Sequence, residues 1–107
     1  QEFKGSLTEN FVAAELHDKH FEGLYYWTSE GIAEVDFVIS TEQYIFPLEV
    51  KAGFSKQKKS LQVYDEKFSK EKHAPLVLSR ASLRNFAFDG KVINYPLYAI
   101  CLFPRFR

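Results

Sequence analysis

The sequence predicts an α/β domain built from a helix, a three-stranded antiparallel meander, a second helix and a further strand. Apolar residues recur at helical spacing over 6–19 and again over 56–70, as they do on helices that pack against a core. Between these segments, three runs rich in β-branched and aromatic residues are separated by short turns, which is typical of neighbouring strands. A short apolar run follows the second helix, so strands lie on both sides of it in the chain.

The first helix is expected over 6–19. Its start, Ser6-Leu7-Thr8-Glu9, has the form of a capping box, in which the Ser and Glu side chains satisfy free N–H groups at a helix N-terminus. Two faces carry apolar residues and are both expected to pack: Leu7, Phe11 and Ala14 on one, Val12 and Leu16 on the other.

Three strands are expected at 24–28, 33–40 and 44–51. The second strand alternates, so that Val35, Phe37 and Ile39 point to one side and Glu34, Asp36 and Val38 to the other. Pro47 lies in the third strand and has no N–H to donate, so we expect a sheet edge or a bulge near it.

The second half of the chain is expected to form a helix over 56–70 and a strand over 75–79. Asp89-Gly90 is typical of a hairpin turn, with 88–92 around it. Residues 95–103 fit either a strand or a short helix with Pro96 at its first position.

Composition indicates one globular domain over 1–107. Hydrophobic residues make up 46% and aromatic residues 17% of the 107 residues, which is enough to build a core and argues against disorder. No apolar run reaches the roughly 18 residues of a membrane span. The single cysteine, Cys101, excludes an internal disulfide framework and a cysteine-based zinc site, which favours a reducing, cytoplasmic setting. The start at Gln1, without Met, favours a fragment of a longer protein.

Charge is divided unevenly along the chain. Residues 1–49 contain ten acidic and two basic side chains, whereas residues 50–107 contain twelve basic and four acidic ones. Such a split points to a phosphate-bearing partner near the second half. The alternative is that folding interleaves the two halves and cancels the field.

The sharpest constellation combines Asp36 on the second strand with Glu49 and Lys51 on the third. Glu49 and Lys51 are two residues apart, so both project from one face. If the two strands pair, Asp36 and Glu49 come within reach of one cation, and Mg²⁺ or Mn²⁺ prefers such oxygen ligands. Glu9 on the first helix could complete the site. Alternatively, Glu49 and Lys51 form an ion pair, Asp36 is solvated and Glu9 only caps the helix.

The chemistry that this constellation predicts is phosphodiester hydrolysis. A metal held by Asp36 and Glu49 would polarise a phosphoryl oxygen and lower the pKa of a bound water. Lys51 would position that water or stabilise charge that develops on the phosphate. An acidic residue two before a lysine occurs four times in this sequence, but only Glu49 lies at the end of an expected strand with an acidic strand partner.

Ordered segments of the chain resemble one known family. They are Gly5 to Val12, Tyr25-Tyr26-Trp27, Ala33 to Phe37, Leu48 to Gly53, Leu83 to Phe86 and Asn94 to Ala99. The chain is similar along nearly its whole length to the uncharacterised C-terminal domain of prokaryotic AAA-type ATPases, whose fold resembles the PD-(D/E)XK nuclease superfamily.

This resemblance implies a restriction-endonuclease-like core with a mixed central sheet, in a domain that follows an upstream ATPase domain. The acidic helix residue of the superfamily corresponds to Glu9, its aspartate to Asp36, and its final acid and lysine to Glu49 and Lys51. All four are present, so the resemblance implies a nuclease-like site without implying that cleavage occurs.

Other motifs carry less weight. Gly53 to Ser60 is a near miss to the phosphate-binding loop with Lys58 at the second glycine, so no ATP site is expected in this chain. Lys56, Lys58 and Lys59 could instead contact nucleic-acid phosphates, or form a solvated surface. His17 and His20 have no third ligand placed by the sequence. Tyr25, Tyr26 and Trp27 are expected to be core and strand residues rather than base-stacking platforms.

The sequence therefore predicts a Mg²⁺- or Mn²⁺-dependent nuclease-like domain acting on DNA, with Asp36 and Glu49 as metal ligands, Lys51 catalytic and Glu9 supporting. One alternative is a non-catalytic module that binds nucleic acid or regulates the attached ATPase. A third possibility is a structural domain whose basic second half contacts acidic surfaces.

Overall fold

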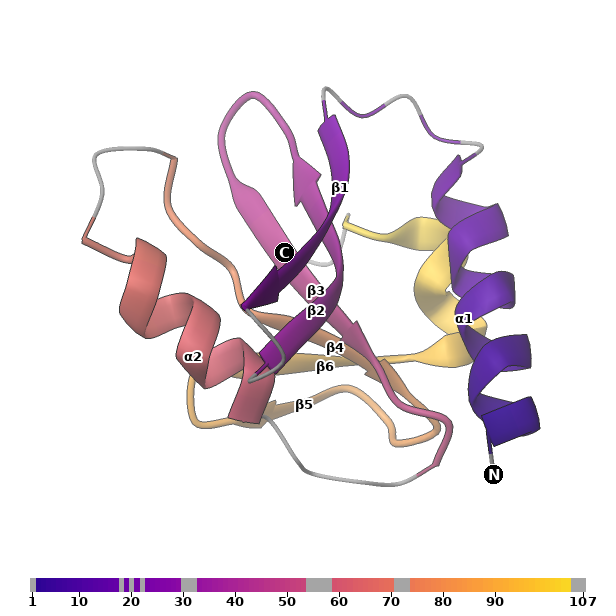
Figure 1. The fold of residues 1–107 in the computed structure, drawn as a ribbon. Coiled ribbons are helices and arrows are strands. Elements are labelled where there is room, and N and C mark those ends of the chain that lie inside the picture. Colours follow the sequence, from indigo (N-terminus) through magenta and orange to yellow (C-terminus); the bar gives the residue numbers. More distant parts are fainter. Residues whose placement is uncertain are drawn as a thin grey trace.

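The chain folds around one six-stranded sheet that is covered by helices on both faces (Figure 1). A computed structural model describes residues 2–17, 19, 21, 23–29, 33–53, 59–70 and 74–104. The elements are α1 (Glu2–His17), β1 (Gly23–Ser29), β2 (Ala33–Ser40), β3 (Ile45–Val50), α2 (Lys59–Phe68), β4 (Ser79–Ser82), β5 (Ala87–Asp89), β6 (Val92–Pro96) and the 3-10 helix η1 (Leu97–Leu102). The α/β class and the order of helices and strands predicted for the first half are confirmed.

The sheet is mixed, with strand order β1-β2-β3-β4-β6-β5. The meander β1-β2-β3 is antiparallel, β4 pairs parallel with both β3 and β6, and the β5–β6 hairpin closes the far edge. Because β3 and β4 are parallel neighbours, the chain must cross over between them, and α2 provides that crossover.

Two apolar cores lie on opposite faces of the sheet. The core beneath α1 and η1 consists of Val12, Leu16, Ile39, Phe46, Leu48, Val50, Ala81, Tyr95, Ile100 and Phe103. The core beneath α2 consists of Val35, Val38, Leu61, Tyr64, Leu78 and Val92. The helices are thus held against the sheet by burial of apolar side chains, which contributes about 25 cal/mol of stabilisation per Å² of apolar surface buried. Helices on both faces fix the sheet.

The start of α1 differs from the prediction. The helix begins at Glu2, so Ser6 lies inside it and the capping-box interpretation of Glu9 is wrong. Of its two apolar faces, only the one with Val12 and Leu16 is buried, whereas Leu7 and Phe11 are exposed. Burial on a single face is what one neighbouring sheet can supply.

Pro47 lies in an interior strand, so the expectation of a sheet edge or bulge beside it is wrong. The N–H groups of Ile45 and Lys51 donate to the carbonyls of Pro75 and Ala81, and alternation would direct an N–H at 47 toward Val77. Proline has none. The Ser79 hydroxyl donates to the Val77 carbonyl instead, at 2.9 Å, which satisfies an acceptor that the ladder leaves open.

In the second half, one strand differs from the prediction and two features agree with it. The fourth strand is Ser79–Ser82 rather than 75–79, where only an isolated bridge joins Leu76 to Ile45. The hairpin turn is confirmed, with Gly90 at a φ of 65° that favours glycine. Residues 95–103 combine both alternatives, because β6 ends at Pro96 and η1 follows it.

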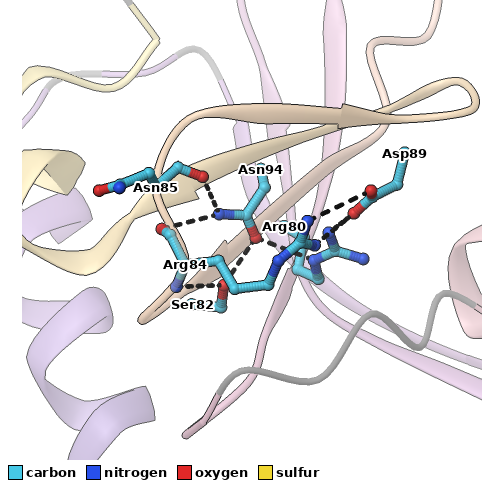
Figure 2. A network of polar contacts seen from close by, with 6 residues as sticks. All are labelled: Arg80, Ser82, Arg84, Asn85, Asp89 and Asn94. Carbon is cyan, nitrogen blue, oxygen red and sulfur yellow. Dashed lines mark hydrogen bonds and ion pairs between the residues drawn. The ribbon is translucent and has the colours of Figure 1, made fainter.

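A buried polar network joins β4, β6 and the loop between β4 and β5 (Figure 2). Asn94 is at its centre and is fully buried. Its Oδ1 accepts from Arg80 Nε at 2.9 Å and from Ser82 Oγ at 2.7 Å. Its Nδ2 donates to the carbonyls of Arg84 and Asn85, both at 3.0 Å. All four hydrogen-bonding positions of the amide are therefore used.

An ion-pair cluster extends this network to the hairpin (Figure 2). The guanidinium groups of Arg80, which is fully buried, and of Arg84 both contact the carboxylate of Asp89. These contacts, chiefly that with Arg84, hold the pKa of Asp89 well below its usual range. The network ties β5 to β4, and Arg80 lies opposite Glu49 in the β3–β4 register, so it also fixes the strand beside the candidate site.

Candidate active site

A β-bulge in β2 determines where Asp36 points. The β1–β2 register pairs Tyr25 with Val38 and Trp27 with Val35, so one residue of β1 faces two residues of β2, Asp36 and Phe37. Val35 and Val38 consequently both face α2, which corrects the expected simple alternation. Bulges re-aim side chains and are frequent beside functional sites.

The β2–β3 ladder ends just before Asp36, and this side chain fills the opening. The last pair of the ladder is Phe37 with Leu48. Along β3, the backbone N–H of Val50 points toward β2, and it donates to Asp36 Oδ2 at 2.7 Å. The carboxyl of Asp36 is thereby anchored at the point where the two strands separate.

Glu49 and Lys51 follow on β3 and form an ion pair. Lys51 Nζ lies 2.8 Å from Glu49 Oε2. Glu49 is only 6% exposed, and its other oxygen, Oε1, is buried without a hydrogen-bond partner among the described residues. A buried carboxylate oxygen without a partner is costly, so Glu49 presents an acceptor that is suited to a ligand.

Glu9 reaches Asp36 from α1. Burial of Val12 and Leu16 seats the helix on the sheet, and the Glu9 side chain forms a hydrogen bond with Asp36. Burial, this hydrogen bond and the nearby charges of Glu9 and Glu49 raise the pKa of Asp36 to about 8, against the lowering effect of the Val50 N–H. Protonated Asp36 therefore donates to the Glu9 carboxylate near neutral pH.

Two pairs of the predicted site residues are joined: Glu9 with Asp36, and Glu49 with Lys51. The charge of Glu49 also acts on Asp36, although Glu49 lies between two residues of the core beneath α1 and therefore projects to the α2 side of the sheet. The roles of these four residues in catalysis and metal binding stay predictions. Lys56 and Lys58 lie outside the described residues. Lys59 is exposed at the start of α2, in a hollow that it shares with Lys91.

The cavity beside these carboxylates was not predicted from the sequence. A cavity of about 450 Å³ is lined by Glu9, Leu24, Tyr25, Tyr26, Glu34, Asp36 and Phe37. Tyr25 and Tyr26 are each 62% exposed, so the expectation that they are core residues is wrong. The expectation is confirmed for Trp27, whose ring packs edge-on against that of Tyr64 with 5.1 Å between the ring centroids. The feature that could have predicted this exposure is the run of three aromatic residues in β1, because an edge strand cannot bury all three.

The site fits a metal ion only in part: oxygen ligands are present, but they are not grouped closely. Asp36 and Glu49 offer hard carboxylate oxygens of the kind that Mg²⁺ and Mn²⁺ prefer. Across the described parts of the chain, however, no group of three or more His, Cys, Asp or Glu side chains is arranged to hold a metal ion. His17 is exposed near the end of α1, and His20 lies outside the described residues.

The fold and site together define an α/β domain in which the hydrogen-bonded side chains of Glu9 and Asp36 lie at a bulged junction of two strands, with the ion pair of Glu49 and Lys51 on the neighbouring strand. The chain belongs to the family described as domain of unknown function (DUF4143), whose model matches residues 4–99. The match spans the chain from α1 into η1 and so contains the whole site. No curated protein and no solved structure matches the chain. None of the described helices is long and apolar enough to cross a membrane.

Proposed function

We propose that this chain is a divalent-metal-dependent nuclease-like domain that hydrolyses phosphodiester bonds of DNA. One observation carries the proposal: burial, a hydrogen bond with Glu9 and the charges of Glu9 and Glu49 raise the pKa of Asp36 to about 8, and Glu49 Oε1 is buried without a described partner. Carboxylates crowded in this way repel one another, and a bound cation would relieve that repulsion.

The residues divide the chemistry among them. Asp36 and Glu49 would hold Mg²⁺ or Mn²⁺, and Glu9 would support Asp36 from the helix. When bound, the metal would polarise a phosphoryl oxygen and lower the pKa of a bound water. Lys51, which Glu49 holds at 2.8 Å, would orient the attacking water and neutralise charge on the phosphate.

The resemblance to PD-(D/E)XK nucleases and to C-terminal domains of AAA-type ATPases supports the same proposal. It favours DNA as the substrate and an ATPase domain as the upstream partner in a longer chain, and the single cysteine favours the cytoplasm as the setting. Lys56, Lys58 and Lys59 would contact phosphates at the start of the second helix.

Cleavage of supercoiled plasmid and of branched DNA in Mn²⁺ tests the proposal. Asp36→Asn and Lys51→Ala are expected to lower the cleavage rate at least about 100-fold, as loss of a metal ligand or of electrostatic stabilisation does. Glu66→Gln and Lys67→Ala on the exposed side of α2 serve as matched controls and should cut like the wild type. Equal cleavage by all five proteins would assign the activity to a contaminant and refute the proposal.

The second candidate is a non-catalytic module that binds DNA or regulates the attached ATPase. The observation that favours it is the lack, among the described residues, of a three-ligand metal group. It predicts DNA binding that falls with rising salt and is unchanged in Asp36→Asn, without cleavage.

A further inference from the structure

We propose that the cavity beside Glu9 and Asp36 receives an unpaired nucleobase, which makes single-stranded or frayed DNA the substrate. This inference rests on the proposed function and specifies the substrate class for the same site. Its basis is that one cavity brings together an exposed aromatic ring, that of Tyr26, and the carboxyl groups of Glu9 and Asp36.

The aromatic part of the cavity lies on β1. Leu24 and Tyr26 line the cavity and are both exposed, Tyr26 at 62%. Tyr25 pairs with Val38, which faces α2, so its ring lies on the other face of the sheet. Exposed aromatic rings provide the stacking surface on which proteins hold bases of single strands. In a duplex, base faces are covered by neighbouring pairs, so this surface would select unpaired bases.

Tyr26 lies beside the carboxyl groups that line the cavity. Tyr26 faces the bulge that contains Asp36, and its hydroxyl donates to Glu34 Oε2 at 2.7 Å. The pKa of Tyr26 is raised by this hydrogen bond and, to a smaller extent, by the charges of Asp36 and Glu9. Neighbouring strands lie about 4.8 Å apart, a separation that a nucleotide bridges between its base and its phosphate.

Tyr25 provides a matched control on the other face of the sheet. It is as exposed as Tyr26, at 62%, and its ring packs over Gly23, away from the carboxylates of the cavity.

The charge of the cavity determines how DNA enters. Glu9, Glu34 and Asp36 line it and would repel a bare phosphate. Binding of the strand should therefore require the divalent cation. An acidic cavity with an exposed tyrosine also suits an amine-bearing peptide through charge and cation–π contact. The requirement for metal separates the two ligands, because a cationic peptide would compete with the metal.

Fluorescence anisotropy with labelled dT12, alone and annealed to dA12, tests the inference in Ca²⁺, with the strand checked for integrity afterwards. We expect wild type to bind dT12 at least about tenfold more tightly than the duplex, and only with the cation present. Tyr26→Ala should weaken binding about 5- to 100-fold. Tyr25→Ala and Tyr98→Ala, the latter at an exposed tyrosine of η1, should bind like wild type.

Equal affinity for strand and duplex, or unchanged binding by Tyr26→Ala, would overturn the inference. So would metal-free, Tyr26-dependent binding of an oligolysine peptide in place of dT12. A parallel calorimetric titration with Mn²⁺ distinguishes the two proposals. If wild type and Tyr26→Ala both bind Mn²⁺ but hold dT12 equally well, only the base-stacking inference fails. If wild type binds no Mn²⁺, the proposed function itself fails.

Discussion

Replacement of Asp36 by Asn is expected to stabilise the fold at high pH and to have little effect at low pH. The structure raises the pKa of Asp36 from 3.8 to about 8, so the folded chain retains a proton that the unfolded chain releases. Stability of the wild type therefore falls as pH rises from about 4 to about 8. Asn cannot ionise, and it can still accept from Val50 N–H and donate to Glu9.

The size of the effect follows from the shift. Each pKa unit corresponds to about 1.4 kcal/mol, which gives an upper bound of about 6 kcal/mol for the whole shift. That bound is comparable to the entire stability of a small domain, about 5–15 kcal/mol. Asp36 is only partly buried, and water screens its charge, so we expect Asn to gain about 1–3 kcal/mol over wild type between pH 5 and pH 9.

Urea denaturation in EDTA at pH 5, 7 and 9 measures this difference. Glu66→Gln, at an exposed carboxylate of α2, should show no such dependence on pH. A difference between Asp36→Asn and wild type that is the same at pH 5 and pH 9 would refute the crowding of carboxylates around Asp36.

Three further predictions concern the framework of the sheet. Asn94→Ala should lower the free energy of unfolding by about 3–5 kcal/mol, because it leaves buried partners of four hydrogen bonds unsatisfied; Asn85→Ala, which keeps its backbone carbonyl, should change urea unfolding little. Ser79→Ala should cost about 1 kcal/mol in a thermal melt, because the Val77 carbonyl loses its donor; no change would mean that water replaces the hydroxyl. Asp89→Asn should destabilise the fold at pH 7, and the loss should shrink as pH falls below about 4, because the pKa of Asp89 is lowered in the folded chain. A loss that is constant from pH 7 to pH 2 would contradict the ion pairs at Asp89.

The meander and the acid–lysine pair could be predicted because they depend on local rules. Side chains two apart on a strand share a face, which placed Glu49 beside Lys51. Short turns made the pairing of β2 with β3 the simplest arrangement, which brought Asp36 to the β3 backbone at Val50. Glu9 reaches Asp36 because α1 packs on the same sheet.

The remaining features depend on contacts that no local pattern shows. The apolar run at 75–79 attracted the strand assignment, whereas β4 is Ser79–Ser82, whose polar residues are buried because Asn94 and Asp89 satisfy them. The bulge at Asp36 is visible only in the register with β1. The exposure of Tyr25 and Tyr26 follows from the edge position of β1, which the order of strands in the sheet decides.

Calorimetric titration with Mn²⁺ tests most directly whether Glu9, Asp36 and Glu49 form one cation site. Wild type is expected to bind one ion at neutral pH, with release of a proton because Asp36 must ionise. Asp36→Asn and Glu49→Gln should lose this binding, and Glu66→Gln should retain it. Undiminished binding by both site variants, or none by the wild type, would contradict the account.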